Sequence, residues 1–177
     1  MKSRPTSAAK QRPESGTIGV TIETPRSSRN KLKYEPAKKK YTLSKILPEG
    51  MVFPYDFGFV PGTKAEDGDP IDVLVLTDEA LFPGCHVDSR LIGVIELTYE
   101  EAGKEKRNDR LIAVARASLL YAEVKDFSAL NAVVLKQVEE FFVNYQRVRN
   151  IKVTIIGRTA PTGPGNSSAA EGHRKTD

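Results

Sequence analysis

Seven short segments rich in β-favouring residues follow one another along the chain and limit the folds that it can adopt. Turn-forming residues separate them, and their spacing is typical of an antiparallel barrel or sandwich. The segments are residues 17–23, 31–35, 40–44, 71–76, 86–97, 110–115 and 151–157.

One stretch has a helical pattern instead. Between Ser128 and Val148, apolar residues recur at steps of three and four, which predicts a single helix with one face packed on the core. Asp126 or Ser128 is the expected N-cap.

Length and composition fit a single domain. The chain has 177 residues, of which 39% are hydrophobic, enough for one core. Residues 1–16 and 158–177 are rich in Pro, Gly and small polar or charged residues, so we expect two disordered tails around a domain at 17–157. The formal net charge of +4 falls mostly in the tails, so the predicted domain is close to neutral, unlike a typical nucleic-acid-binding body.

Cysteine usage and hydropathy point to the cytoplasm. A single cysteine, Cys85, excludes an internal disulfide. No apolar run reaches the roughly 18 residues of a membrane span, and no apolar core follows the basic residues at the start, as a secretory signal would require. We therefore expect a soluble cytoplasmic protein without a membrane partner.

Three aspartates stand at the start of a strongly apolar segment. Asp67, Asp69 and Asp72 precede or begin the run IDVLVL, with Gly68 and Pro70 placed to form a tight turn. Crowded carboxylates repel one another and need positive partners. Hard oxygen ligands of this kind suit Mg²⁺ or Mn²⁺, although Asp-Gly-Asp-Pro is also an ordinary polar turn.

The run DGDPIDVLVLT resembles the signature of the family I soluble inorganic pyrophosphatases. Similarity extends through FPYDFGFVPGT, IETPRSSRNKLKYE, GVIEL, NDRLIAVA and FFVNYQ, and so covers roughly residues 17–156. The resemblance implies a mainly β fold with flanking helices (α+β). In that fold a small antiparallel five-stranded OB-like β-barrel carries one long C-terminal helix.

The resemblance also implies roles for the acidic residues. Asp69 would accept the proton of the attacking water. Metal ligands are expected at Asp67, Asp72, Glu100 and Asn108, with Asp109 as the alternative to Asn108 if the alignment shifts by one residue.

Further residues would bind or surround the substrate. Substrate-binding positions are expected at Lys33, Lys45, Arg110 and Tyr145, and Glu23 and Glu35 would line the cavity. The chain departs from the family pattern at several of its positions. The departures are Lys45 and Arg110 (exchanged cations), Phe53 and Phe57 (for tyrosines), Glu100 and Asn108 (for aspartates) and Gln146 (for lysine).

The implied activity is Mg²⁺-dependent hydrolysis of inorganic pyrophosphate to two orthophosphates, with Mn²⁺ as a possible substitute. Family analogy also implies a homo-oligomer, commonly a hexamer. The departures leave two alternatives open. One is a degenerate member that binds a phosphate-containing ligand or nucleic acid without turnover, and the other is an enzyme that hydrolyses a different diphosphate or polyphosphate. We expect no specific nucleic acid, because the aspartates would make the mouth of the barrel acidic.

Overall fold

The structure is a computed structural model that describes residues 16–65, 68–147 and 150–161. Its strands are β1 (Thr17–Thr24), β2 (Asn30–Glu35), β3 (Lys40–Ile46), β4 (Asp56–Phe59), β5 (Asp72–Leu76), β6 (His86–Glu101), β7 (Lys104–Arg107), β8 (Arg110–Ala115) and β9 (Lys152–Thr159). The helices are the 3₁₀-helix η1 (Phe127–Ala129) and α1 (Ala132–Arg147). Most of the two predicted tails lies outside the described residues, and β9 extends past the predicted domain end to Thr159.

Five of the strands close into a ring. The pairing order is β1, β4, β5, β8 and β6, and β6 pairs again with β1. This closure confirms the expected OB-like architecture. One pair differs from the prediction, because β5 and β8 run parallel. A parallel pair needs a long connection, which β6 and its hairpin with β7 provide.

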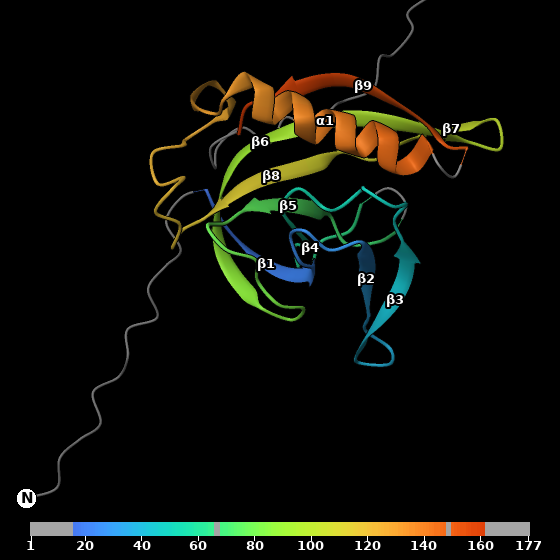
Figure 1. Ribbon diagram of the computed structural model, residues 1–177, viewed down its shortest axis with the longest axis horizontal. Helices are drawn as coiled ribbons and strands as arrows, with labels where there is room; N and C mark the ends of the chain where they lie inside the picture. Colours follow the sequence, from blue (N-terminus) through green and yellow to red (C-terminus); the bar gives the residue numbers. More distant parts are fainter. Residues whose placement is uncertain (1–15, 66–67, 148–149, 162–177) are drawn as a thin grey trace, which may run out of the picture.

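Strand β6 belongs to two parts of the fold. Its first residues pair with β1, while its last residues pair with β7 and β9. Figure 1 shows the β6–β7 hairpin projecting beyond the ring at the right of the view. Residues 104–107 lie outside the seven predicted β segments, yet they form the strand β7.

The apolar run of β5 is buried on both faces. Val73 and Val75 belong to one core cluster and Leu74 and Leu76 to another, and all four are 0% exposed. Successive side chains of a strand point to opposite faces, so a strand covered on both sides is apolar throughout. Asp72, at the start of this strand, therefore has a rigid support.

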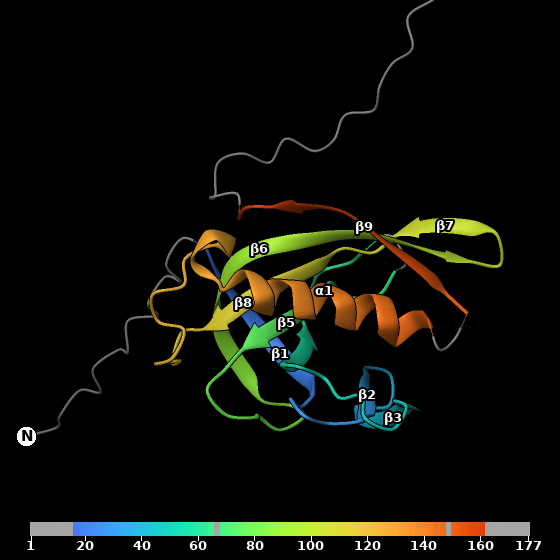
Figure 2. The same cartoon turned by 45° about the horizontal axis from the view of Figure 1, so that its top comes forward.

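Helix α1 lies across the strands of the ring and beside β9 (Figures 1 and 2). It begins later than predicted, and the Asn131 side chain caps it by accepting a hydrogen bond from the Val133 N–H at 2.8 Å. Asp126 instead caps η1. The buried face of α1 consists of Leu135, Val138, Phe142 and Tyr145. No helix in the described part of the chain is long and apolar enough to cross a membrane.

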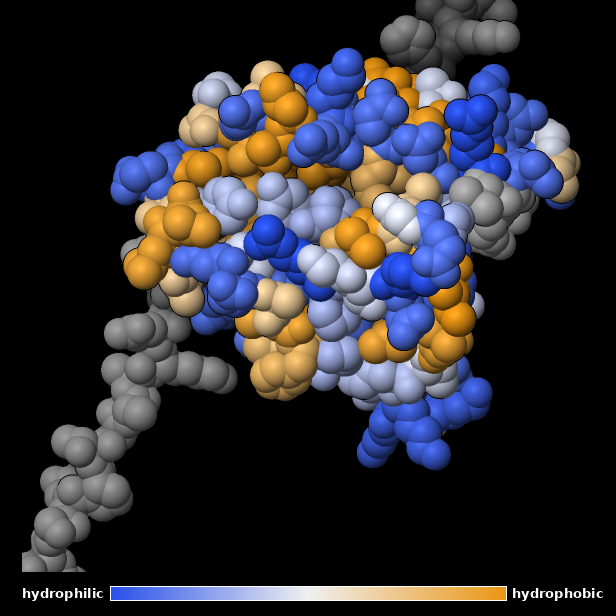
Figure 3. Space-filling model, in the orientation of Figure 1, coloured by the Kyte–Doolittle hydropathy of each residue, from blue (hydrophilic) through white to orange (hydrophobic). Residues whose placement is uncertain are grey.

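Strands β2 and β3 form a separate hairpin beside the ring (Figure 2). Thr24, at the end of β1, anchors it, because its hydroxyl accepts from the Leu32 N–H at 3.0 Å. Lys31 and Lys45 are cross-strand neighbours at the anchored end. The outer end is exposed, and Figure 3 shows it as a hydrophilic projection. The anchored end therefore faces the ring and α1, and the outer end faces solvent.

Strand β4 lies outside the seven β segments that the sequence predicted. It pairs with β1 and β5. Gly58 is needed at its centre, because a Cβ there would lie 2.1 Å from the carbonyl oxygen of Thr21. Asp56 is 0% exposed, and its carboxylate accepts from the Thr77 hydroxyl and from the N–H groups of Arg26 and Leu81. Backbone contact and these hydrogen bonds hold β4 in place.

Candidate functional site

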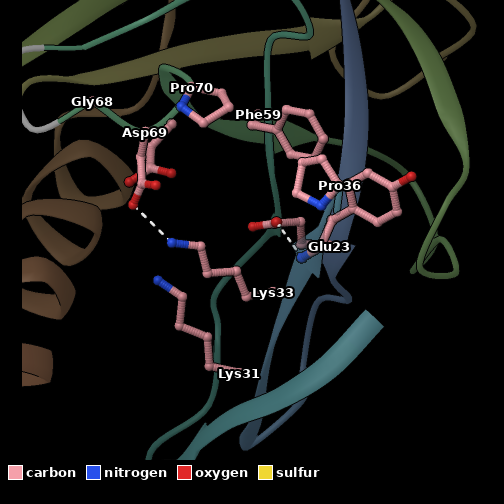
Figure 4. Close-up of a pocket in the computed structure, with 10 residues that line it drawn as sticks. Glu23, Lys31, Lys33, Pro36, Phe59, Gly68, Asp69 and Pro70 are labelled. Atoms are coloured by element: carbon pink, nitrogen blue, oxygen red, sulfur yellow. Dashed lines mark hydrogen bonds and ion pairs between the residues drawn. The ribbon is translucent and has the colours of Figure 1, made fainter. Parts of the chain in front are cut away.

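A polar cavity of about 270 Å³ opens between β1, the β2–β3 hairpin and the start of β5. Figure 4 shows ammonium groups from β2 facing carboxylates from the turn before β5. The cavity is lined by Glu23, Lys31, Lys33, Tyr34, Pro36, Phe59, Gly68, Asp69, Pro70 and Asp72.

The turn before β5 brings two aspartates to this cavity. Gly68 has a φ of +90°, a conformation that glycine adopts without the steric cost of a side chain. The Ala65 N–H donates to the Asp69 carbonyl at 2.7 Å and closes the turn. Asp69 and Asp72 therefore line one cavity, as predicted from the sequence. Asp67, the third aspartate of that prediction, lies outside the described residues.

Lys33 forms an ion pair with Asp69. Its Nζ lies 2.7 Å from Asp69 Oδ2, and both side chains are exposed to solvent. The hydrogen bond to Asp69 is the main reason that the pKa of Lys33 is raised above 10.5. Lys31 extends beside Lys33, with its ammonium group on the same side (Figure 4).

Arg110 supports the other aspartate. Its Nη1 lies 2.9 Å from Asp72 Oδ2, and the guanidinium lies 5.8 Å from the centre of the Phe142 ring. Arg110 is only 7% exposed, and it also donates a hydrogen bond to the Asn108 side chain. Arg110, predicted to bind the substrate, and Asn108, predicted to bind a metal ion, are thus hydrogen-bonded to each other, and Arg110 pairs with an aspartate of the cavity.

The Asp109 carboxylate bonds to the β6–β7 hairpin instead. Its carboxylate accepts from the Leu97 N–H at 3.3 Å and from Arg107 Nε at 2.9 Å. These bonds hold the base of the β6–β7 hairpin together. Arg110 thus bonds to the side chain of Asn108, whereas it bonds to Asp109 through the backbone carbonyl oxygen, at 3.2 Å.

A second group of cations surrounds Tyr145 of α1. The Nζ atoms of Lys31 and Lys45 lie 5.5 and 4.8 Å from the centre of its ring. The Tyr145 side chain is 6% exposed and packs against Phe53 and Phe141. Because Lys31 also lines the cavity, it links the carboxylates at one end to the Lys45–Tyr145 pair at the other.

Tyr145 is expected to ionise at a lower pH than Tyr55. Burial alone raises the pKa of Tyr145, but Lys31 and Lys45 outweigh burial and bring the pKa below 10.0. Burial and a hydrogen bond with Tyr121 raise the pKa of Tyr55 to about 12. In a spectrophotometric titration of the tyrosines, Tyr145→Phe should remove the ionisation that occurs at the lowest pH. Lys45→Met should move this ionisation to higher pH. If the unaltered protein and both variants show the same first ionisation, this arrangement of Tyr145 and the two lysines is contradicted.

Glu23 forms the buried wall of the cavity. It is 6% exposed, and its carboxylate accepts from the Tyr34 N–H at 2.7 Å. Burial is the main reason that the pKa of Glu23 is raised above 4.5, although the Tyr34 hydrogen bond and Lys31 act in the opposite direction. The negative charge of Asp72 raises it further.

Comparison with known proteins identifies the family. The model of the family described as inorganic pyrophosphatase matches residues 20–164, which include every described residue of the cavity. The chain belongs to this family. An inorganic pyrophosphatase of Synechocystis sp. is 34% identical over 82% of this chain and 83% of its own length. One of Pseudomonas aeruginosa is 37% identical over 86% of this chain and 84% of its own length.

Solved structures of family members share the fold. The inorganic pyrophosphatase of Thermus thermophilus superposes with a TM-score of 0.76 at 29% identity, covering 90% of this chain and 88% of that chain. The inorganic pyrophosphatase of Helicobacter pylori also gives 0.76, at 28% identity, covering 88% of this chain and 90% of that chain. The five-stranded ring and its helix are thus those of the pyrophosphatase family.

Glu100 and Glu35 are predicted site residues that the structure places away from the cavity. Glu100 is exposed on β6, where it pairs with Glu105 of β7 and Lys152 of β9. Glu35 lies at the outer end of the β2–β3 hairpin, and its carboxylate accepts from the Thr42 hydroxyl at 2.8 Å and pairs with Lys38 Nζ at 2.6 Å. These contacts lower the pKa of Glu35, those to Lys38 and Thr42 being the largest causes.

Lys31 lines the cavity but was not among the predicted site residues. Its spacing could have indicated this role, because Lys31 and Lys33 are two residues apart on one strand and can share a face. Phe53 and Phe57, noted as replacements of tyrosines, are 1% and 2% exposed in the core with their rings 5.5 Å apart. They contribute apolar packing rather than polar groups, and the Phe53 ring packs against Tyr145.

The donor set is compatible with a hard divalent cation. Asp69 and Asp72 present carboxylate oxygens to one cavity, with Glu23 on the opposite wall. Among the described residues, no three Asp, Glu, His or Cys side chains are grouped tightly enough to hold a metal ion by themselves. Mg²⁺ does not require such a cage, because it usually keeps several waters and binds one or two carboxylates plus substrate phosphates.

Proposed function

We propose that this protein hydrolyses inorganic pyrophosphate to two orthophosphates. One observation carries the proposal: the carboxylates of Asp69 and Asp72 share a cavity with the ammonium groups of Lys31 and Lys33. Cations suit a polyanionic substrate, and carboxylates suit a metal ion and a proton acceptor. Membership of the inorganic pyrophosphatase family supports the same reaction.

Lys31, Lys45 and Tyr145 form the phosphate-binding end of the proposed site. The two ammonium groups lie over one aromatic ring, so a phosphate group between them would neutralise two adjacent charges. The lowered pKa of Tyr145 reflects the same concentration of positive charge. Lys33 and Arg110 are the remaining cations that we assign to the substrate, and each is paired with an aspartate in this structure.

Asp69 is the proposed general base. It is exposed at the rim of the cavity and lies on the turn, where water can reach its carboxylate. Accepting a proton from the attacking water would leave hydroxide to displace one phosphate group from the other. Lys33 holds the Asp69 carboxylate toward β2, and therefore toward the substrate end of the cavity.

Mg²⁺, or Mn²⁺ in its place, is the proposed cofactor. Asp67 and Asp72 are the proposed ligands, and Asn108, which bonds to the same Arg110 as Asp72, is a proposed further position. A bound divalent cation would neutralise substrate charge and make a coordinated water more acidic. Glu23 would line the site by virtue of its buried carboxylate beside Asp72.

Phosphate release from inorganic pyrophosphate, measured with Mg²⁺ and again after chelation, tests this function. We expect release with Mg²⁺ and a loss of nearly all activity without it. Absence of release at any Mg²⁺ or Mn²⁺ concentration would contradict the proposal. Binding of an oligonucleotide at about 0.2 M salt without hydrolysis would instead support the binding-only alternative.

The remaining proposals concern organisation. We place the functional domain at 17–157 between two tails, and we infer a cytoplasmic homo-oligomer from family analogy. Exposed apolar side chains outside the cavity, including Phe82, Leu119 and Leu120, are available for contacts between subunits. Light scattering on the purified protein tests the oligomeric state.

A further inference from the structure

Two carboxylates that line the proposed site, those of the metal ligand Asp72 and of the general base Asp69, are paired with positively charged side chains of the chain itself. Lys33 Nζ lies 2.7 Å from Asp69 Oδ2, and Arg110 Nη1 lies 2.9 Å from Asp72 Oδ2. Carboxylate oxygens are the donors that a hard divalent cation requires. A side-chain cation and a metal ion on one oxygen would repel each other, so either group must move before the other can bind fully.

We propose that Lys33 and Arg110, through their ion pairs with Asp69 and Asp72, oppose the binding of a divalent cation beside these carboxylates and so set the metal affinity of the site. The proposal rests on the proposed function for the position of the metal site. It goes beyond that function because it gives the positively charged side chains of Lys33 and Arg110 a role in metal binding.

The two ion pairs differ in how readily they can open. The side chains of Lys33 and Asp69 are 45% and 58% exposed, and water screens such a pair strongly. The side chains of Arg110 and Asp72 are 9% and 25% exposed, and Arg110 is also bound by Asn108 and packed on Phe142. A metal ion can therefore displace Lys33 from Asp69, whereas Arg110 stays paired with Asp72.

Exchange at Asp69 has a consequence for substrate binding. Lys33 and Lys31 extend side by side from β2, as Figure 4 shows. Once its ammonium group leaves Asp69, Lys33 remains next to Lys31 in the same cavity. Two unneutralised ammonium groups then face an incoming anion, so metal binding and anion binding reinforce each other.

Arg110 affects the site differently, because it stays in place. Its positive charge beside Asp72 reduces the attraction of that carboxylate for a dication. Asn108, the other acceptor of Arg110, is uncharged and does not restore the lost negative charge. The expected result is a centre that needs a higher metal concentration than its number of aspartates suggests.

Binding of Mn²⁺ alone, followed by electron paramagnetic resonance without substrate, tests the competition at Asp69. Lys33→Met should bind Mn²⁺ about two- to fivefold more tightly than Lys40→Met, an equal charge change at the exposed end of the same hairpin. Lys33→Arg keeps the ion pair and should resemble the unaltered protein. Equal affinities in Lys33→Met and Lys40→Met, including no binding in either, would overturn the proposal at Asp69.

The same measurement on Arg110→Met tests the second pair. Mn²⁺ should bind about tenfold more tightly in this variant, because its pair with Asp72 is largely shielded from water. Arg110→Lys, which keeps the charge, controls for altered packing and should show a smaller gain. An affinity in Arg110→Met equal to or below that in Arg110→Lys would overturn the proposal at Asp72. Both results are independent of hydrolysis, so an inactive protein would remove the proposed function without deciding this inference.

Discussion

Replacing Asp69 with asparagine is expected to lower kcat for pyrophosphate hydrolysis by about 10²- to 10⁴-fold. The amide has nearly the shape of the carboxylate, and its oxygen can still accept the hydrogen bond from Lys33 Nζ that the structure shows at 2.7 Å. What it cannot do is accept a proton from the attacking water. The loss should therefore appear in kcat, with KM changed much less.

Asp88→Asn is the matched control for this experiment. Asp88 is exposed on β6 and lies outside the cavity that Asp69 lines, so the same chemical change there should leave kcat within about twofold. Steady-state phosphate release and a thermal unfolding curve for each variant complete the test. A folded Asp69→Asn protein with kcat within tenfold of the unaltered protein would show that another group accepts the proton.

The sequence predicted the fold wherever local pattern and burial agree. The run of β5 is apolar because both of its faces are buried, and residues 110–115 of β8 show the same feature. The helix was predicted for a similar reason, since its buried residues recur at helical spacing. Its cap was wrong because Asp126 and Asn131 are both good caps, and Asp126 is used by the short η1 instead.

Two strands gave no such signal. The residues of β7 are all exposed, so they show no alternation of apolar and polar side chains. The preceding turn, Ala102 and Gly103, has φ angles of 53° and 74° and joins the strands with two residues, but Ala-Gly lacks the usual Asn-Gly or Asp-Gly cue. In β4, the central Gly58 reads as a turn residue, whereas it is needed for close approach to Thr21.

At the site, the sequence predicted which residues would meet but not how they would pair. It indicated that crowded aspartates need positive partners, and it assigned that role to a metal ion. In the structure, Lys33 and Arg110 already provide a positive charge to Asp69 and Asp72. Such pairs join residues far apart in the sequence, and only the closed ring and the hairpin beside it bring them together.

Lys31→Met is expected to reduce kcat/KM for pyrophosphate by about 10- to 100-fold. Lys31 lies between the two parts of the site, since it lines the cavity with Asp69 and also stands 5.5 Å from the centre of the Tyr145 ring. Methionine keeps most of the side-chain volume but removes the ammonium group. A phosphate bound there would lose one charge-assisted hydrogen bond, and Lys45 alone would face it.

The matched control is Lys40→Met, which removes the same charge at the exposed end of the hairpin and should change kcat/KM by less than about twofold. If both variants lose activity equally, Lys31 acts only through the overall charge of the hairpin and not through a contact with phosphate. Lys31→Arg discriminates further, because a retained charge with a different shape should recover part of the loss. Inhibition by orthophosphate gives an independent measure: its inhibition constant should rise in Lys31→Met and stay unchanged in Lys40→Met, since the product contacts the same ammonium group as the substrate.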